Sequence, residues 1–294
     1  MSRSPRYTRD PKSIGGIIIQ PRDKEIIDLV WRYRFLNSEQ IQALVSGSDQ
    51  TILRRLQKLY HHGYLDRPIS QIVFSNPLFG LKKMVYGLGD RGADLLAERY
   101  GIDRGKISWH EKNREVGERY IQHTLMVSDF RACLTLALRG KPEIRLQWLN
   151  DGGKEIKQEV HFIEGGRNRR LPVVPDGFFQ IEDSGGKMYF FLEADRSTMT
   201  NARFLNKMRA YWLWWRQGGQ RELGIENFRV LTITKSKERM RNLVEVTKGA
   251  DDSGRGSYMF WFSCIDNYHL SQPESILEGI WLTPRDNIPH HLLE

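Results

Sequence analysis

The stretch YFFLEADRSTMT, at residues 189–200, decides the fold of the larger part of this chain. Its apolar residues predict a buried strand, yet the strand ends on Glu193 and Asp195, and carboxylates are seldom buried without a partner. Because side chains alternate along a strand, both acids share one face with Phe191, and we expect the opposite face to pack inward. The sequence therefore predicts a strand that presents two acids at its carboxyl end, where α/β sheets place their ligands.

The segments around this strand follow the order of a mixed α/β sheet. A long helical pattern over 111–140 comes first. Strands are then expected at 144–150, 158–163, 175–181, 187–195, 228–234 and 257–265, with helices at 200–217 and 237–248. GGRNRR and DSGGK are expected to be hairpin loops between strands. Residues 111–294 are thus predicted to form one α/β domain with helices on the faces of its sheet.

A hairpin across DSGGK brings a third acid, Asp176, towards Glu193. Asp176, Glu193 and Asp195 together offer the oxygen ligands that Mg²⁺ prefers, and such a metal neutralises charge on a scissile phosphate. Lys207 and Tyr211 lie four residues apart on the next helix, so both can approach the acids from one side. The cluster is therefore a candidate catalytic site, with Asp176 and Glu193 as the metal ligands.

The same acids also fit a second interpretation, in which they belong to a structural ion network. Arg196, Arg203 and Lys207 are close enough in the sequence to pair with Glu193 or Asp195. Perturbed carboxylates occur in structural networks as well as in active sites. No cofactor follows from this alternative, whereas Mg²⁺ follows from the first.

The positive charge of the chain lies in its first half. Residues 1–150 contain 25 Lys and Arg against 16 Asp and Glu, whereas residues 151–294 contain 20 of each. An uneven distribution of this kind indicates that the first half meets a polyanion such as nucleic acid, and a basic surface that only aids solubility is the alternative interpretation. Residues 1–19 are expected to be a flexible basic arm.

Residues 20–103 predict a winged helix-turn-helix. Three short helices are expected at 20–36, 37–45 and 47–65, with capping residues before the second and third. Two strands at 64–74 and 82–88 follow and would form the wing, and a helix restarts at 89–101. The chain is therefore α+β overall.

The third helix is the candidate DNA-reading element. Ile52, Leu53, Leu56, Leu59 and Tyr60 form its apolar stripe, and polar residues fall largely off that stripe. The residues expected to contact DNA in the major groove are Gln50, Thr51, Arg54, Arg55, Lys58 and His62. The competing interpretation is that the basic residues only keep an exposed face in water.

The pattern of Pro175-Asp176, then Glu193-Ala194-Asp195, then Lys207 and Tyr211 resembles the PD-(D/E)XK nuclease-like fold. The resemblance implies an Asp and a Glu that bind metal, and a Lys two residues after the second acid that positions water. Asp195 occupies that Lys position here, so Lys207 would have to serve as a migrated lysine.

Over residues 20–235, the winged helix, YIQHTLMVSDF and the acidic motif with FLNKMRAYW resemble the replication-relaxation family. The motif positions that match are Asp176, Glu193, Asp195, Thr198, Lys207 and Tyr211. The resemblance implies a DNA-binding protein of a plasmid or other mobile element, acting in replication, mobilisation or transcriptional control. A Mg²⁺-dependent endonuclease or nickase is the alternative.

Other features limit the partners and the compartment. YWLWW at 211–215 is apolar nearly all round the helix, which is typical of a core helix and also of a homodimer interface. Cys133 and Cys264 are the only cysteines, so neither a disulfide framework nor a cysteine-based zinc site is expected. No run of 18 apolar residues exists, so we expect no membrane span and a cytoplasmic location.

Overall fold

The computed structural model describes residues 6–72, 83–107, 113, 115–151, 156–286 and 288–294. The chain divides into two compact units, Met1–Ala132 and Cys133–Glu294. The division falls inside the long helix α6, Glu118–Arg139, whereas the sequence suggested a boundary between residues 103 and 111. The first turns of α6 therefore belong to the first unit.

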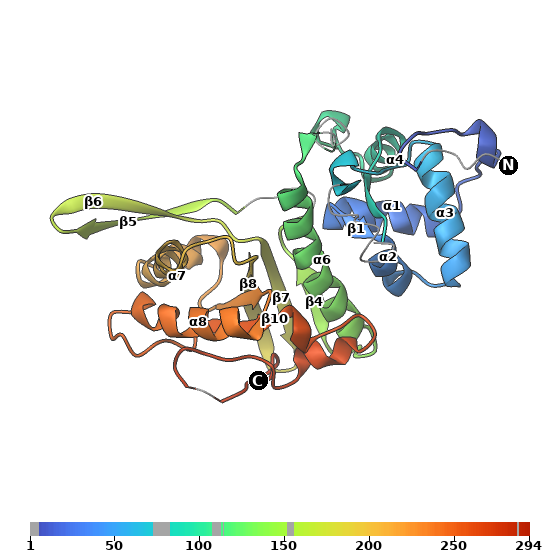
Figure 1. Ribbon diagram of the computed structural model, residues 1–294. Helices are drawn as coiled ribbons and strands as arrows, with labels where there is room; N and C mark the ends of the chain where they lie inside the picture. Colours follow the sequence, from blue (N-terminus) through green and yellow to red (C-terminus); the bar gives the residue numbers. More distant parts are fainter. Residues whose placement is uncertain (1–5, 73–82, 108–112, 114, 152–155, 287) are drawn as a thin grey trace. The chain divides into compact units, whose positions relative to one another are not determined.

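The first unit combines short helices with a small sheet of order β1-β3-β2, in which both pairings are antiparallel. Its elements, coloured blue to green in Figure 1, are α1 (Pro21–Tyr33), β1 (Leu36–Asn37), α2 (Ser38–Leu44), α3 (Asp49–His61), β2 (Leu65–Asp66), β3 (Val85–Leu88) and α4 (Asp90–Tyr100). The three helices expected from the sequence are present, each shorter than its predicted range.

Local sequence explains where these helices begin. Pro21 occupies the first turn of α1, where its missing N–H costs nothing, and Gln20 and Asp23 form a capping box there. Asn37 and Gln40 form a second capping box at α2, as the sequence predicted. Ser48 caps α3 by accepting a hydrogen bond from the Thr51 N–H.

The predicted strand over 64–74 is wrong in most of its length. β2 covers only Leu65–Asp66, and a 3-10 turn, Ile69–Ile72, follows Pro68, which lacks the N–H that a strand ladder needs. The buried Gln71 replaces the missing ladder: its side-chain amide donates to the Val85 carbonyl at 3.0 Å and accepts from the Val85 N–H at 2.9 Å. The rest of the predicted wing, residues 73–82, lies outside the described residues.

The first turns of α6 complete the core of this unit. Phe35, Val85 and Ile121 form a buried cluster, with Leu125 packed against it. The Gln40 amide donates to Asp129 at 2.6 Å, and Ser128 donates to the Phe35 carbonyl at 2.8 Å. These contacts explain why the unit extends to residue 132.

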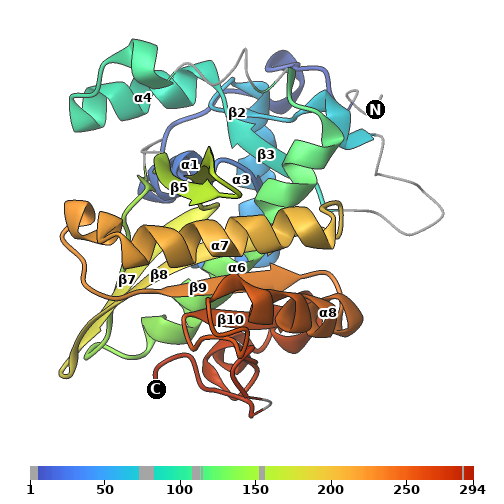
Figure 2. The same cartoon turned by 90° about the vertical axis from the view of Figure 1, so that its left-hand side faces the viewer.

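The second unit is built on a five-stranded mixed sheet of order β10-β9-β8-β7-β4. β8, β9 and β10 are parallel, and β7 is antiparallel to both β8 and β4. The strands are β4 (Arg145–Trp148), β7 (Gly177–Asp183), β8 (Gly186–Asp195), β9 (Arg229–Thr234) and β10 (Phe260–Cys264). Helices α7 (Asn201–Arg216) and α8 (Lys237–Thr247) lie over one face of this sheet (Figure 2).

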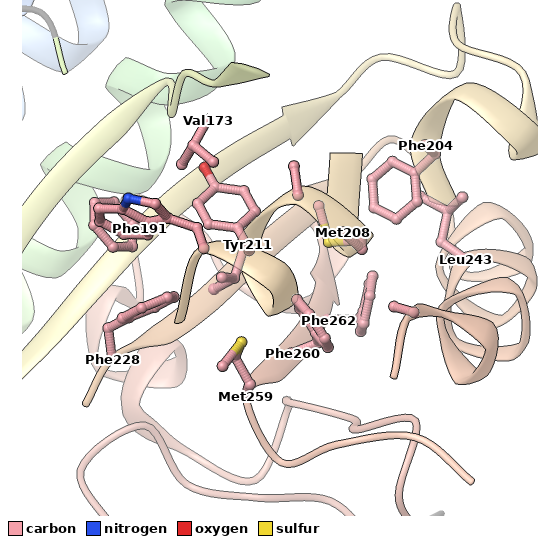
Figure 3. Packing of buried hydrophobic residues seen from close by; sticks show 14 of the residues in the cluster. Val173, Phe191, Phe204, Met208, Tyr211, Phe228, Leu243, Met259, Phe260 and Phe262 are labelled. Carbon is pink, nitrogen blue, oxygen red and sulfur yellow. The ribbon is translucent and has the colours of Figure 1, made fainter. Parts of the chain in front are cut away.

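Both faces of β8 are buried, so the expectation that only one face packs inward is wrong. Leu192 on one face and Phe191 on the other are fully buried. Figure 3 shows Phe191 gathered with Tyr211 of α7 and Phe228, and the ring centroid of Phe191 is 5.6 Å from that of Tyr211 and 4.9 Å from that of Phe228. The acids of β8 are therefore covered by helices instead of facing water.

A hairpin of β5 (Gln158–Glu164) and β6 (Arg167–Val173) stands apart from this sheet. The sequence predicted β5 but took GGRNRR for a loop. Only Gly165 and Gly166 form the turn, with φ of 57° and 74°, the left-handed geometry that a two-residue hairpin turn requires. Among the described residues of both units, no helix combines the length and apolar composition needed to cross a bilayer.

Candidate functional site

One side of α3 is open to solvent and carries polar groups. Gln50, Leu53, Arg54 and Gln57 are exposed and lie at intervals of three and four residues, which places them on one helical face. Leu53 is 44% exposed, so it does not belong to the apolar stripe predicted for α3. The opposite side, with Ile52, Leu56 and Leu59, is fully buried.

Arg55 does not lie on this face, in contrast to the prediction. It is 9% exposed, and its Nε donates to Asp23 Oδ1 at 2.8 Å while Nη2 pairs with Oδ2 of the same carboxylate. Asp23 is fully buried and also accepts from the Gln20 N–H at 2.8 Å. Arg55 therefore joins α3 to the beginning of α1 and has no access to DNA in this arrangement.

Lys58 and His62 contact the segment that precedes α1. Lys58 Nζ donates to the Gly16 carbonyl at 3.1 Å, and His62 Nε2 lies 2.9 Å from the Gly15 carbonyl. Nearby, the Asp10 N–H donates to His61 Nδ1 at 2.8 Å. The part of the basic arm that the structure describes thus runs along α3, although the sequence suggested a flexible segment.

Thr51, the remaining predicted DNA contact, lies in the first turn of α3. Its Oγ1 accepts a hydrogen bond of 2.9 Å from the hydroxyl of Ser48, the residue that caps the helix. Thr51 is half-buried, so it borders the exposed face.

In the second unit, the structure brings Asp176 and Glu193 together as the sequence predicted. The Asp176 N–H donates to the Leu192 carbonyl at 2.9 Å, and Asp176 Oδ2 accepts from the Ala194 N–H at 2.8 Å. These two bonds fix Asp176 beside β8 on either side of Glu193. Asp176 is half-buried, whereas Glu193 is 3% exposed.

Both carboxylate oxygens of Glu193 are occupied by side chains of α7. Tyr211 donates its hydroxyl to Oε1 at 2.6 Å, and Lys207 pairs with Oε2. Lys207 and Tyr211 are one helical turn apart, so a single face of α7 covers the acid. The predicted approach of these two residues to the acids is therefore present.

Burial and neighbouring charge shift the protonation of this cluster. Burial raises the pKa of Glu193 to about 7, although Lys207 opposes the shift. Burial alone would lower the pKa of Lys207, but the negative charges of Glu193 and Asp176 raise it above its usual value. Burial and Glu193 hold the pKa of Tyr211 well above its usual value, so its hydroxyl stays neutral and donates.

Asp195 has a different partner from those that the sequence suggested. Arg239 of α8 donates from Nε to Asp195 Oδ2 at 2.8 Å and from Nη2 to Oδ1 at 3.3 Å. The Ser197 N–H also donates to Oδ2 at 3.1 Å. Asp195 is thus held by a fork of two hydrogen bonds from Arg239, which also occupies both of its oxygens.

These contacts decide whether the cluster fits a resident Mg²⁺ ion. Both oxygens of Glu193 already accept hydrogen bonds, and so do both oxygens of Asp195. A metal would have to displace Lys207 or Tyr211 before it could reach Glu193. Within the described part of the chain, no group of three or more His, Cys, Asp or Glu is arranged to hold a metal. The residues as they stand do not fit the ion.

Three residues of these sites were missed by the sequence analysis. The register between parallel β8 and β9 places Asp195 opposite Thr234, so the first turn of α8 starts near the acid, and this could have indicated Arg239. Gln57 lies seven residues after Gln50 and shares its helical face. Asp23 had no signal as a partner of Arg55, because the two residues belong to different helices.

The comparison with protein families identifies the family of the chain. The family model described as replication-relaxation matches residues 28–227, which include α3, Asp176, Glu193 and α7. Neither the comparison with curated proteins nor that with solved structures gave a match. Since the matched region covers more than half of the sequence, the chain belongs to the replication-relaxation family.

Proposed function

We propose that this protein is a sequence-specific double-stranded DNA-binding protein that acts in replication, mobilisation or transcriptional control of a plasmid or other mobile element. The observation that carries the proposal is the exposed face of α3, with Gln50, Leu53, Arg54 and Gln57. The family, replication-relaxation, supports a role in replication or relaxation of such elements.

The surroundings of α3 support a winged helix-turn-helix. α2 and α3 are separated by four residues, 45–48, and Gly47 has a φ of 135° that a larger residue would adopt only with strain. Turns of this length, often with a glycine, join the two helices of DNA-binding motifs. β2 follows α3 after three residues and pairs with β3.

The exposed side chains of α3 have the chemistry of base recognition. Arg54 can donate two hydrogen bonds to guanine, and the amides of Gln50 and Gln57 can pair with adenine. Leu53 adds an apolar contact of the kind that a thymine methyl group accepts. The exposed Leu53 side chain gains no stability from contact with water, so this face suits a groove that presents both polar and apolar base edges.

Charge supports the same surface. The first unit carries 22 Lys and Arg against 15 Asp and Glu, a net charge of +7, while the second unit carries 23 against 21. Phosphate contacts by Lys and Arg provide the sequence-independent part of DNA affinity. The unit that presents α3 therefore carries the larger positive charge with which to attract a duplex.

A selection experiment tests the proposal. Wild-type protein, incubated with a pool of random duplexes, is expected to enrich one motif, whereas Gln50→Ala/Arg54→Ala/Gln57→Ala retains salt-sensitive binding but enriches none. Arg99→Ala is the control, because Arg99 is an exposed cation of the same unit on α4. Enrichment of the same motif by the triple variant would remove α3 from the reading surface.

We also propose a nuclease-like fold for the second unit, in which the acidic cluster stabilises the unit without catalysis. The occupied oxygens of Glu193 and Asp195 support this interpretation. A nuclease-like fold without a working site serves as a binding module, since the fold alone does not determine activity.

A Mg²⁺-dependent endonuclease is the second candidate, and Lys207 is the observation in its favour. Lys207 forms an ion pair with Glu193, and the charge of Asp176 helps to raise its pKa. A migrated lysine would have to lie at this position, beside both acids. Supercoiled plasmid incubated with protein and Mg²⁺ or Mn²⁺ separates the two candidates. Nicking by wild type but not by Asp176→Asn would establish the nuclease, and a metal-dependent rise in Tm would accompany it.

The protein is further proposed to be a homodimer, which suits a palindromic DNA site. Tyr211 and Trp214 are buried in the core of their own unit, so a dimer surface on α7 would use the half-buried Trp212 and Trp215. Analytical ultracentrifugation of wild type and Trp212→Gln tests this point, and an unchanged monomer in both would exclude it.

A further inference from the structure

The β5–β6 hairpin is a two-stranded ribbon that pairs with no strand of the five-stranded sheet. Its base is anchored: Val160 and Val173 are buried in the core beneath α7. Residues 164–170 at its tip are all exposed, and Glu164 there accepts a hydrogen bond of 3.1 Å from Arg209 of α7. Figure 1 shows the ribbon running past α7 and projecting from the second unit.

The tip carries a local concentration of positive charge. Arg167, Arg169 and Arg170 fall within four residues. The carboxylates of Glu164 and Glu159 lie 3.9 Å from the guanidinium groups of Arg169 and Arg170, respectively, which is too long for a hydrogen bond. In the described part of the chain, these guanidinium groups therefore keep donors available for the oxygens of another molecule.

An exposed apolar side chain lies on the same face of the ribbon as Arg170, whereas Arg167 and Arg169 lie on the opposite face. Ile163 is 74% exposed and is paired across the ribbon with Asn168. Because side chains alternate along a strand, Ile163 shares one face with His161, and Arg170 lies opposite His161 on that face. A ribbon tip that combines arginines with an exposed isoleucine can bind phosphates and touch base edges at the same time.

We infer that the β5–β6 ribbon is a second DNA-contacting element, which enters a groove of duplex DNA. The strands of a ribbon are about 4.8 Å apart, and the major groove, about 12 Å wide, admits two of them. The arginines bind backbone phosphates and Ile163 packs on the base edges. This inference rests on the proposed DNA-binding function and adds a contact in the second unit.

A second copy of the chain fits the ribbon less well than DNA. Two ribbons placed edge to edge would bring like charges together, and Pro172 in β6 lacks the N–H that an added strand would need. Charges and proline on an exposed strand protect it from pairing with another protein. A polyanion meets neither obstacle.

The test compares two variants that lose equal charge from the same unit. The ribbon variant is Arg167→Ala/Arg169→Ala/Arg170→Ala, and the control is Arg221→Ala/Arg241→Ala/Arg255→Ala, at exposed positions outside the ribbon. Affinity for duplex DNA is measured by fluorescence anisotropy at several salt concentrations. The ribbon variant is expected to bind about tenfold more weakly. Its slope of log K against log salt is expected to be less steep by about 2 to 3 units.

Two further variants separate charge from packing. Arg→Lys at the same three ribbon positions is expected to restore the slope, because lysine also binds phosphate. Ile163→Ser is expected to weaken binding without changing the slope, because it removes an apolar contact only. Circular dichroism and Tm of each variant should match wild type, since the tip is exposed.

These experiments distinguish failure of the ribbon inference from failure of α3 as the DNA-reading element. If the α3 variant loses its motif while the ribbon variant binds like the control, the ribbon inference is overturned and the proposed function stands. If neither the wild-type protein nor any variant binds duplex DNA, the proposed function and the ribbon inference both fail. A ribbon variant that changes the sedimentation coefficient of DNA-free protein also overturns the inference, in favour of self-association.

Discussion

Arg54 and Arg55 are adjacent in the sequence, but the fold gives them different roles. Arg54 is exposed on α3, whereas Arg55 forms a buried pair with Asp23. The sequence showed two basic residues off the apolar stripe and could not distinguish them, because the partner of Arg55 belongs to another helix. The predicted exposure was thus correct for Arg54 and wrong for Arg55.

Arg55→Ala is expected to destabilise the protein by about 3 to 5 kcal/mol, because it leaves the carboxylate of Asp23 buried without its cation. Arg54→Ala is the matched control and should change the free energy of unfolding by less than about 0.5 kcal/mol. Urea unfolding followed by circular dichroism measures both. Equal losses in the two variants would contradict the structural role of Arg55.

Glu193 should make stability depend on pH in a window set by its pKa. Its pKa rises from 4.5 to about 7 on folding, so the folded state binds more protons between these values. The free energy of unfolding therefore decreases by at most about 3 kcal/mol as pH rises from about 5 to 7, and it becomes level above that range. Urea unfolding at pH 5, 6, 7 and 8 measures this slope.

Glu193→Gln, which cannot ionise, should flatten that decrease. Glu159→Gln removes an exposed carboxylate of β5 and should leave the slope as it is in wild type. The comparison concerns slopes, so a uniform loss of stability in Glu193→Gln does not affect it. A slope that is unchanged in Glu193→Gln would show that another group titrates in this window.

At the scale of the elements, strong local signals were sufficient for most helices and for the central strands. The capping residues Asn37 and Ser48 and the apolar run before Glu193 each marked an element correctly. β6 was missed because RNRRLPV has no alternation of apolar and polar residues; it is a strand because it pairs with β5. The strand predicted over 64–74 was too long, because the side chain of Gln71, and not the backbone of a strand, bonds the N–H and carbonyl of Val85.

The junction between α3, β2 and α4 depends on two glycines that lie against each other. Gly63 has a φ of 80°, and a Cβ on Gly89 would lie 2.4 Å from the Gly63 carbonyl oxygen. Gly89→Ala is therefore expected to cost about 3 kcal/mol, since the obstacle is backbone that cannot rotate away. Gly140→Ala, where a Cβ meets nothing within 4 Å, should change stability by less than about 0.5 kcal/mol. Thermal unfolding of the two variants tests this difference.

At the scale of the whole molecule, both cysteines are buried in the second unit, at Cys133 and Cys264. Burial also raises the pKa of the Cys264 thiol, which lowers its fraction of reactive thiolate. The native protein is expected to react slowly with a thiol reagent, and two thiols should react at once in guanidinium chloride. Rapid reaction of one thiol in native protein would show that the second unit opens locally.

The buried pair of Asp23 and Arg55 has a consequence for how this family diversifies. A change at either position alone leaves a buried charge without its partner, so the two positions should change together among relatives. The exposed positions 50, 53, 54 and 57 carry no such constraint from the fold. Under the proposed function, they are free to follow the DNA sequence of each host element, and a new target site can be acquired there without rebuilding the helix that carries it.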